Sequence, residues 1–73
     1  MTSYKDMTIK NIRRMLDGHK IDVYTTSVNI KYVSNDSHIR VLLLERFLKY
    51  SRGYNSSKDK RAIEALLMYC EAE

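Results

Sequence analysis

The chain has 73 residues, 44% of them hydrophobic, and 13 Lys and Arg against nine Asp and Glu give it a net charge of +4. This length allows one domain over residues 1–73 with a thin core, so we expect a homodimer to add stability. Because Cys70 is the single cysteine, an internal disulfide is excluded and a reducing, cytoplasmic compartment is favoured. The longest apolar run, Val41 to Leu44, is far shorter than the roughly 20 residues that span a bilayer, so we predict no membrane contact.

The N-terminal segment predicts a helix over residues 4–17. Ser3 and Asp6 have the spacing of a capping pair, and Gly18 is placed to end the helix. One stripe of this helix is apolar and consists of Ile9, Ile12 and Leu16.

Residues 20–33 are rich in Ile, Val, Tyr and Thr, whose branched and aromatic side chains favour strands. The apolar positions are odd at Ile21 and Val23 and even at Val28 and Ile30, so the alternation changes parity. A turn or bulge between them would restore it. We therefore predict a β-ribbon or hairpin here, built from two strands or from one bent strand.

Two helices are predicted after the ribbon. The first runs from the capping residues 35–37 to about Ser51, with Gly53 as a stop signal, and the second starts after Ser56 or Ser57. Both carry broad apolar stripes, made in the first by Ile39, Val41, Leu43, Leu44, Phe47, Leu48 and Tyr50 and in the second by Ala62, Ile63, Leu66, Leu67 and Cys70. The predicted fold is a small α+β domain with an N-terminal helix, the ribbon, and two C-terminal helices packed as a helical hairpin. An all-helical bundle is the alternative.

Residues 49–61 concentrate the net charge. They hold five basic residues against the single acid Asp59, while the remaining 60 positions carry eight basic and eight acidic residues. A loop and a helix start in this segment would offer hydroxyls, a tyrosine and the backbone N–H groups of residues 57–60 to a phosphate-bearing ligand. The predicted binding residues are Lys49, Arg52, Tyr54, Ser57, Lys58, Lys60 and Arg61. The alternative is a solvated loop whose charges keep the protein soluble.

A second basic group lies on the first helix and consists of Lys10, Arg13 and Arg14. It would join the binding surface if the fold placed it beside residues 49–61. Amphipathic helices also carry such residues on their solvent side, which is the alternative interpretation.

Catalytic and metal-binding patterns are lacking in the sequence. His19 and His38 each have a carboxylate nearby, but neither has the three or four convergent ligands that a metal needs. Cys70 lies on an apolar stripe, where burial would raise the pKa of its thiol rather than activate it. We predict that the protein is not an enzyme and uses no cofactor or metal.

A run of strand residues 28–33, a helix from residue 36, Gly53 and then a Ser-capped helix resembles the ribbon-helix-helix family of small DNA-binding regulators over about 45 residues. In that family, strands from two chains pair into a ribbon that enters the major groove. The resemblance implies that Asn29, Lys31 and Val33 would face the groove and that Ser56, Ser57 and Lys58 would contact the DNA backbone.

We predict a non-catalytic regulatory protein that binds nucleic acid, or a nucleic-acid-handling complex, through its basic inter-helix loop. The alternative is an accessory protein that binds and inhibits a larger host complex, because the short, Pro-free composition is similar to that of phage and mobile-element proteins. Charge would steer the loop equally well to nucleic acid or to an acidic protein surface. A third interpretation is a structural subunit that dimerises through its last two helices.

Overall fold

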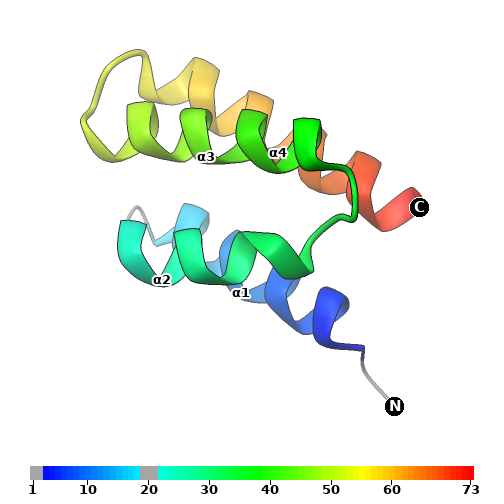
Figure 1. The fold of residues 1–73 in the computed structure, drawn as a ribbon. Coiled ribbons are helices and arrows are strands. Elements are labelled where there is room, and N and C mark those ends of the chain that lie inside the picture. Colours follow the sequence, from blue (N-terminus) through cyan, green and yellow to red (C-terminus); the bar gives the residue numbers. More distant parts are fainter. Residues whose placement is uncertain (1–2, 19–21) are drawn as a thin grey trace.

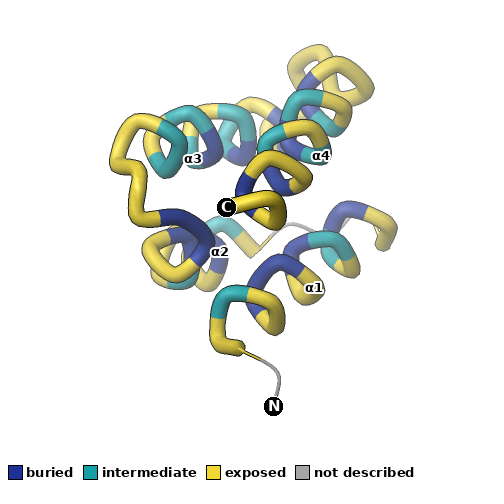
Figure 2. The backbone as a smooth tube through the Cα atoms, turned by 90° about the vertical axis from the view of Figure 1, so that its right-hand side faces the viewer, coloured by how far each residue is buried: buried dark blue, intermediate teal, exposed yellow. Residues whose placement is uncertain are grey.

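The computed structural model describes residues 3–18 and 22–73, which form four α-helices and one 3₁₀ turn (Figure 1). These are α1 (Tyr4–Asp17), α2 (Val23–Asn29), η1 (Ile30–Tyr32), α3 (Ser37–Ser51) and α4 (Ser56–Ala72). Figure 2 shows the four helices around one centre, with α3 beside α4, α2 below α3 and α1 below α4. None of the helices in this part of the chain is long and apolar enough to span a membrane.

The predicted α+β fold is wrong, because the described residues contain no strand. Residues 22–33 of the predicted ribbon form α2 and η1, and its residues 20 and 21 lie outside the described residues. The resemblance to ribbon-helix-helix regulators therefore does not hold, since that family reads DNA through a strand pair.

The segment is helical because its buried side chains follow a helical period. Thr26, Ile30 and Val33 are buried at spacings of four and three residues, which is the period of a helix and not the alternation of a strand. The carboxylate of Asp22 caps the helix by accepting hydrogen bonds from the backbone N–H of Thr25 at 3.2 Å and from its hydroxyl at 2.7 Å. Packing and capping thus override the strand preference of the branched residues.

Both predicted bounds of α1 are confirmed, and α3 ends at Ser51 as predicted. Ser3 caps α1 by accepting a hydrogen bond from the backbone N–H of Asp6, and Gly18 follows the last turn. Asp36 caps α3. Val41 was expected on the apolar stripe of α3, but it is 55% exposed.

The core lies where the four helices meet. Buried apolar side chains come from α1 (Ile9, Ile12, Leu16), from η1 and the residue after it (Ile30, Val33), from α3 (Leu43, Phe47, Tyr50) and from α4 (Ile63, Leu67, Cys70). The hydroxyl of Tyr50 donates to the backbone carbonyl of Leu16 at 3.4 Å, so α3 is also tied to the end of α1 by a buried polar contact.

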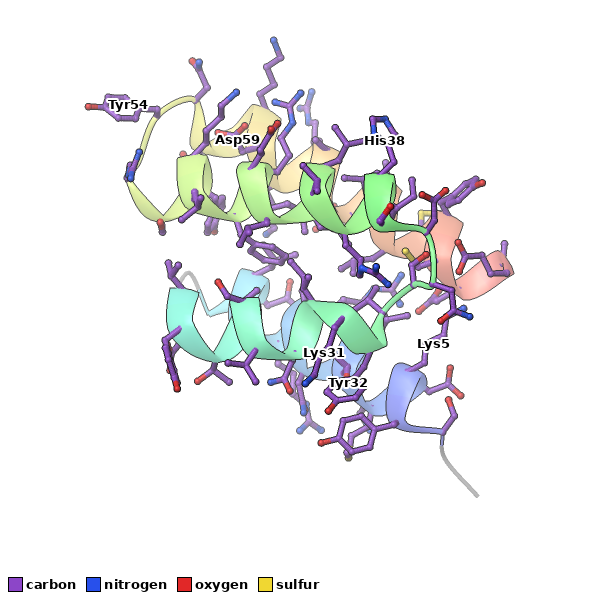
Figure 3. All side chains as sticks on the ribbon, viewed as in Figure 1. Lys5, Lys31, Tyr32, His38, Tyr54 and Asp59 are labelled. Atoms are coloured by element: carbon purple, nitrogen blue, oxygen red, sulfur yellow. The ribbon has the colours of Figure 1, made fainter. Side chains whose placement is uncertain are left out.

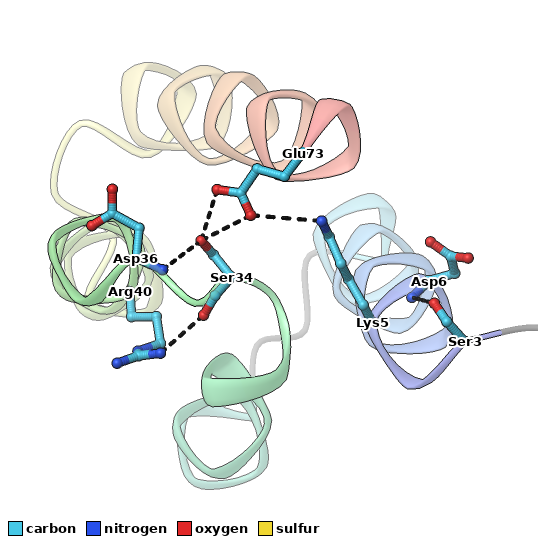
Figure 4. Close-up of polar contacts among 7 residues, drawn as sticks. All are labelled: Ser3, Lys5, Asp6, Ser34, Asp36, Arg40 and Glu73. Carbon is cyan, nitrogen blue, oxygen red and sulfur yellow. Dashed lines mark hydrogen bonds and ion pairs between the residues drawn. The ribbon is translucent and has the colours of Figure 1, made fainter.

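Polar contacts join the end of α4 to α1 and to the connection between η1 and α3 (Figure 4). The hydroxyl of Ser34 donates to the Glu73 carboxylate at 2.9 Å, and Lys5 lies 3.6 Å from the same group. The guanidinium of Arg40 donates to the backbone carbonyl of Ser34 at 3.0 Å. The partly buried position of Arg40 is therefore explained by a contact within the chain.

Candidate nucleic-acid interface

The connection between α3 and α4 forms a basic corner that we call the α3–α4 elbow, residues 49–61. After α3 ends, Gly53 adopts φ +81° and Asn55 adopts φ +49°, so the chain reverses within four residues. The side chain of Tyr54 is 68% exposed and points away from the body of the molecule (Figure 3). The elbow thus extends side chains beyond the helix layers.

Four cations of the elbow are exposed and have no ion-pair partner among the described residues. They are Lys49, Arg52, Lys58 and Arg61. Glu45 precedes Lys49 by one helical turn, but the two do not pair within 4.0 Å. Unpaired cations gathered on one corner create a local positive potential that attracts phosphates.

The one acid of the elbow is turned inward. Asp59 is 1% exposed, and its Oδ1 accepts a hydrogen bond from Arg46 of α3 at 3.1 Å. Its Oδ2 is buried without a hydrogen-bond partner among the described residues. This pair holds the first turn of α4 against α3 and removes the carboxylate from the surface, so the charged side chains that the elbow exposes are all basic.

Sequence reasoning missed this role of Asp59, which was expected only near the positive end of the helix. The available signal was its position four residues before Ile63 and eight before Leu67, which places a carboxylate on the apolar stripe of α4. A basic residue on the facing helix, here Arg46, is what such a position requires.

Two predicted binding residues are used within the chain. Lys60 lies 4.0 Å from Asp17 of α1, and the guanidinium of Arg13 donates to both carboxylate oxygens of Glu71 at 2.6 and 3.2 Å. Both pairs join α1 to α4, beside a shallow hollow of about 200 Å³ whose lining includes Asp17 and Arg13. Lys60 and Arg13 therefore contact acidic residues of the same chain, and their charges are partly compensated.

The other two cations predicted on α1 remain at the surface. Lys10 and Arg14 are exposed and have no ion-pair partner within residues 3–18 and 22–73. The contact between Asp17 and Lys60 places the last turn of α1 against the first turns of α4. The fold therefore brings the end of the α1 basic group toward the elbow, although Arg13 is paired.

The start of α4 differs from the predicted one. The helix begins at Ser56 with Asn55 as the capping residue, and the N–H of Asp59 already bonds to the Asn55 carbonyl at 3.0 Å. Ser57 consequently lies inside the first turn, and the N–H groups left open are those of Ser56, Ser57 and Lys58 rather than of residues 57–60. No side chain caps this end.

The described residues contain no group of three or more His, Cys, Asp or Glu side chains that could hold a metal. His38 is exposed in the first turn of α3, and His19 lies outside the described residues. Cys70 is buried as predicted, and burial, followed by the charge of Glu73, raises the pKa of its thiol above the ordinary value.

Comparison of the chain with protein-family models, with curated proteins and with solved structures found no match.

Proposed function

We propose that this chain is a non-catalytic regulatory protein that binds nucleic acid, or a nucleic-acid-handling complex, through the α3–α4 elbow. The observation that carries the proposal is that most cations of the elbow are exposed whereas its acid is buried. Lys49, Arg52, Lys58 and Arg61 are exposed and unpaired within the described chain, whereas the nearby acid Asp59 is buried against Arg46. We place the protein in the cytoplasm, because its single buried thiol suits a reducing compartment.

Phosphate contact accounts for the grouping of these features. Lys and Arg side chains that neutralise phosphates release condensed counterions, which supplies much of the affinity of nucleic-acid binding. The open N–H groups at the start of α4 add partial positive charge at the same corner. Tyr54, projecting from the tip, offers a ring on which an unpaired base could stack.

Fluorescence anisotropy tests the proposal, with labelled double-stranded DNA, single-stranded DNA and RNA titrated at several salt concentrations. We expect saturable binding whose logarithm falls linearly with the logarithm of salt. The Lys58→Ala, Arg61→Ala double variant should bind more weakly and lower the salt slope by about two, since each lost phosphate contact removes about one.

The matched control removes the same net charge away from the elbow with Lys10→Ala, Lys31→Ala. If the elbow is the contact site, this variant should lose much less affinity than the elbow variant, while circular dichroism shows both folded. Equal losses would mean that binding follows net charge alone and would contradict the proposal. Absence of binding at low salt for all three nucleic acids would also reject it.

A second candidate function is inhibition of a larger protein complex, the accessory role considered from composition. The observation that favours it is apolar exposure on α4 beyond the elbow, where Met68 is 63% and Tyr69 is 57% exposed. Phosphate does not need such side chains, whereas aromatic residues and Met are enriched in protein interfaces. A complex that survives Lys58→Ala, Arg61→Ala and is lost with Met68→Asp would favour this role over nucleic-acid binding.

A further inference from the structure

The tip of the α3–α4 elbow carries one aromatic ring that packs against no other part of the fold. Tyr54 is 68% exposed, and within residues 3–18 and 22–73 its ring makes neither an aromatic stack nor a cation contact. Figure 3 shows the side chain pointing away from both helices. The neighbouring Gly53 adopts φ +81°, and the space into which a side chain there would project is open. The ring and the backbone beside it are therefore accessible to a ligand.

Exposed cations lie on both sides of this ring along the chain. Lys49 in the last turn of α3 and Arg52 directly after that helix precede Tyr54. Lys58 and Arg61 follow it in the first two turns of α4, three residues apart and therefore neighbours on the helix surface. None of the four has an ion-pair partner among the described residues. The order along the elbow is thus two cations, a ring and two cations.

A single nucleic-acid strand has a matching order, because each base is attached to a backbone with a phosphate on either side. Unpaired bases can turn outward and stack on aromatic side chains while cations contact the backbone, which is the usual way in which proteins bind single strands. The ring of Tyr54 and the cations on its two sides supply both kinds of contact.

A duplex does not match this order. Its bases are stacked on one another and present only their edges in the grooves, so a ring at the tip finds no base face. The helices α3 and α4 lie side by side (Figure 1), and two helices of roughly 10 Å each make an end about 20 Å wide, which exceeds the roughly 12 Å of a major groove. Insertion of the ring between base pairs would require them to unstack, which costs free energy.

We propose that the elbow binds single-stranded nucleic acid in preference to duplex, with one base stacked on Tyr54 and the phosphates on either side held by the flanking cations. Tyr54 is then the residue that determines this specificity. The inference rests on the proposed function and names the class of nucleic acid that the elbow takes. Charge alone makes the opposite prediction, because a duplex has the higher charge density and releases more counterions per phosphate contact.

Fluorescence anisotropy tests the preference with a labelled oligonucleotide of about 15 nucleotides, as single-stranded DNA, as RNA and as the DNA duplex of the same sequence, a length that covers one short binding site. We expect the single strands to bind with a Kd about tenfold below that of the duplex. Tyr54→Ala should raise the Kd for the single strands by about tenfold and leave the Kd for the duplex unchanged. The salt slope should stay the same, since stacking releases no counterions.

Two control variants separate stacking from other effects of the substitution. Tyr54→Phe keeps the ring and removes the hydroxyl, so it should bind single strands as the wild-type chain does. Tyr24→Ala removes a ring that is 79% exposed on α2, away from the elbow, and should leave every Kd unchanged. Circular dichroism checks that the variants remain folded.

An oligonucleotide without bases isolates the contact between base and ring. It keeps the phosphates, so the wild-type chain should bind it about as weakly as Tyr54→Ala binds the normal single strand. Tyr54→Ala should cause no further loss with this probe, because the ring and the base act as one interacting pair.

Three results would overturn the inference while leaving the proposed function in place. The first is duplex binding as tight as single-strand binding. The second is a Tyr54→Phe variant as weak as Tyr54→Ala, which would assign the effect to a hydroxyl contact. The third is an equal effect of Tyr54→Ala on strands with and without bases. Absence of binding to all of these nucleic acids at low salt would instead reject the proposed function and this inference together.

Discussion

Asp59 shows how one residue can set the charge of a surface from beneath it. A buried carboxylate is costly unless it is paired, and Arg46 supplies the pair at 3.1 Å while remaining one third exposed to solvent. The second carboxylate oxygen has no protein partner among the described residues, so Arg46 bears most of the compensation. Removing Arg46 would leave an uncompensated buried charge.

We predict that Arg46→Met, which keeps most of the side-chain stem, destabilises the protein by about 2 kcal/mol, below the range for a fully buried pair because solvent reaches the guanidinium. The double variant Arg46→Met, Asp59→Leu should regain most of that loss, because it removes both charges. Urea unfolding followed by circular dichroism measures the three free energies of unfolding. A double variant as unstable as the single one would show that packing, and not the unpaired charge, causes the effect.

The sequence identifies the candidate binding residues as a group but does not show which of them pair within the chain. The grouping of cations in residues 49–61 is visible in the chain, but Lys60 and Lys58 look equivalent there. Only the placement of α1 against α4 shows that Lys60 faces Asp17 while Lys58 has no partner in the described chain. Contacts between residues distant in sequence decide which charges stay available, and local patterns do not encode them.

At the scale of elements, α2 is stabilised by its surroundings more than by its composition. It has seven residues, fewer than an isolated helix needs in water, and four of them are Val or Thr. Its stability comes from the Asp22 cap and from burial of one side against the core. The hydroxyl of Thr26 is buried there, with the sulfur of Met15 at 3.8 Å as its side-chain partner.

We predict that Thr26→Val stabilises the protein by about 1 kcal/mol, although it raises the strand preference of the segment, because it removes a weakly bonded buried hydroxyl. Thr25→Val, the same change one residue earlier, should instead destabilise by about 0.5 kcal/mol through loss of the hydrogen bond to Asp22. Thermal unfolding with unchanged helical circular dichroism checks both signs. Loss of helix signal in Thr26→Val would mean that local preference governs α2 after all.

The contrast between α2 and the longer helices explains which elements were predictable. In α1 and α3, caps, apolar periodicity and stop signals all agree, and the predicted bounds hold. In α2 the branched residues favour a strand while the spacing of Thr26, Ile30 and Val33 favours a helix. The start of α4 was misplaced because Asn55, in a left-handed conformation, takes the capping position that Ser56 or Ser57 could have filled.

At the scale of the whole molecule, two kinds of contact join the helices. The centre is an apolar cluster that includes Phe47 at 0% exposure, and the rim consists of exposed ion pairs such as Arg13 with Glu71. Burial of a large ring contributes several kcal/mol, whereas exposed pairs contribute about 1 kcal/mol or less. The packing of α1 onto α4 therefore depends on apolar side chains more than on its ion pairs.

We predict that Phe47→Ala costs about 4 kcal/mol and leaves this small domain largely unfolded at room temperature. Arg13→Ala should cost less than about 1 kcal/mol, with a melting temperature that is only slightly lower. Circular dichroism at increasing temperature compares the two variants. A comparable loss in both would mean that the rim, and not the core, holds α1 in place.

The ion pair between α3 and α4 joins residues that lie close together in sequence. This closeness affects the order in which the helices pack during folding. Arg46 and Asp59 are 13 residues apart, whereas Arg13 and Glu71 are 58 apart and Tyr50 and Leu16 are 34 apart. Closing a short loop loses less chain entropy than closing a long one, so short-range pairings form sooner. We therefore predict that the α3–α4 hairpin forms first during folding and that α1 docks onto it later.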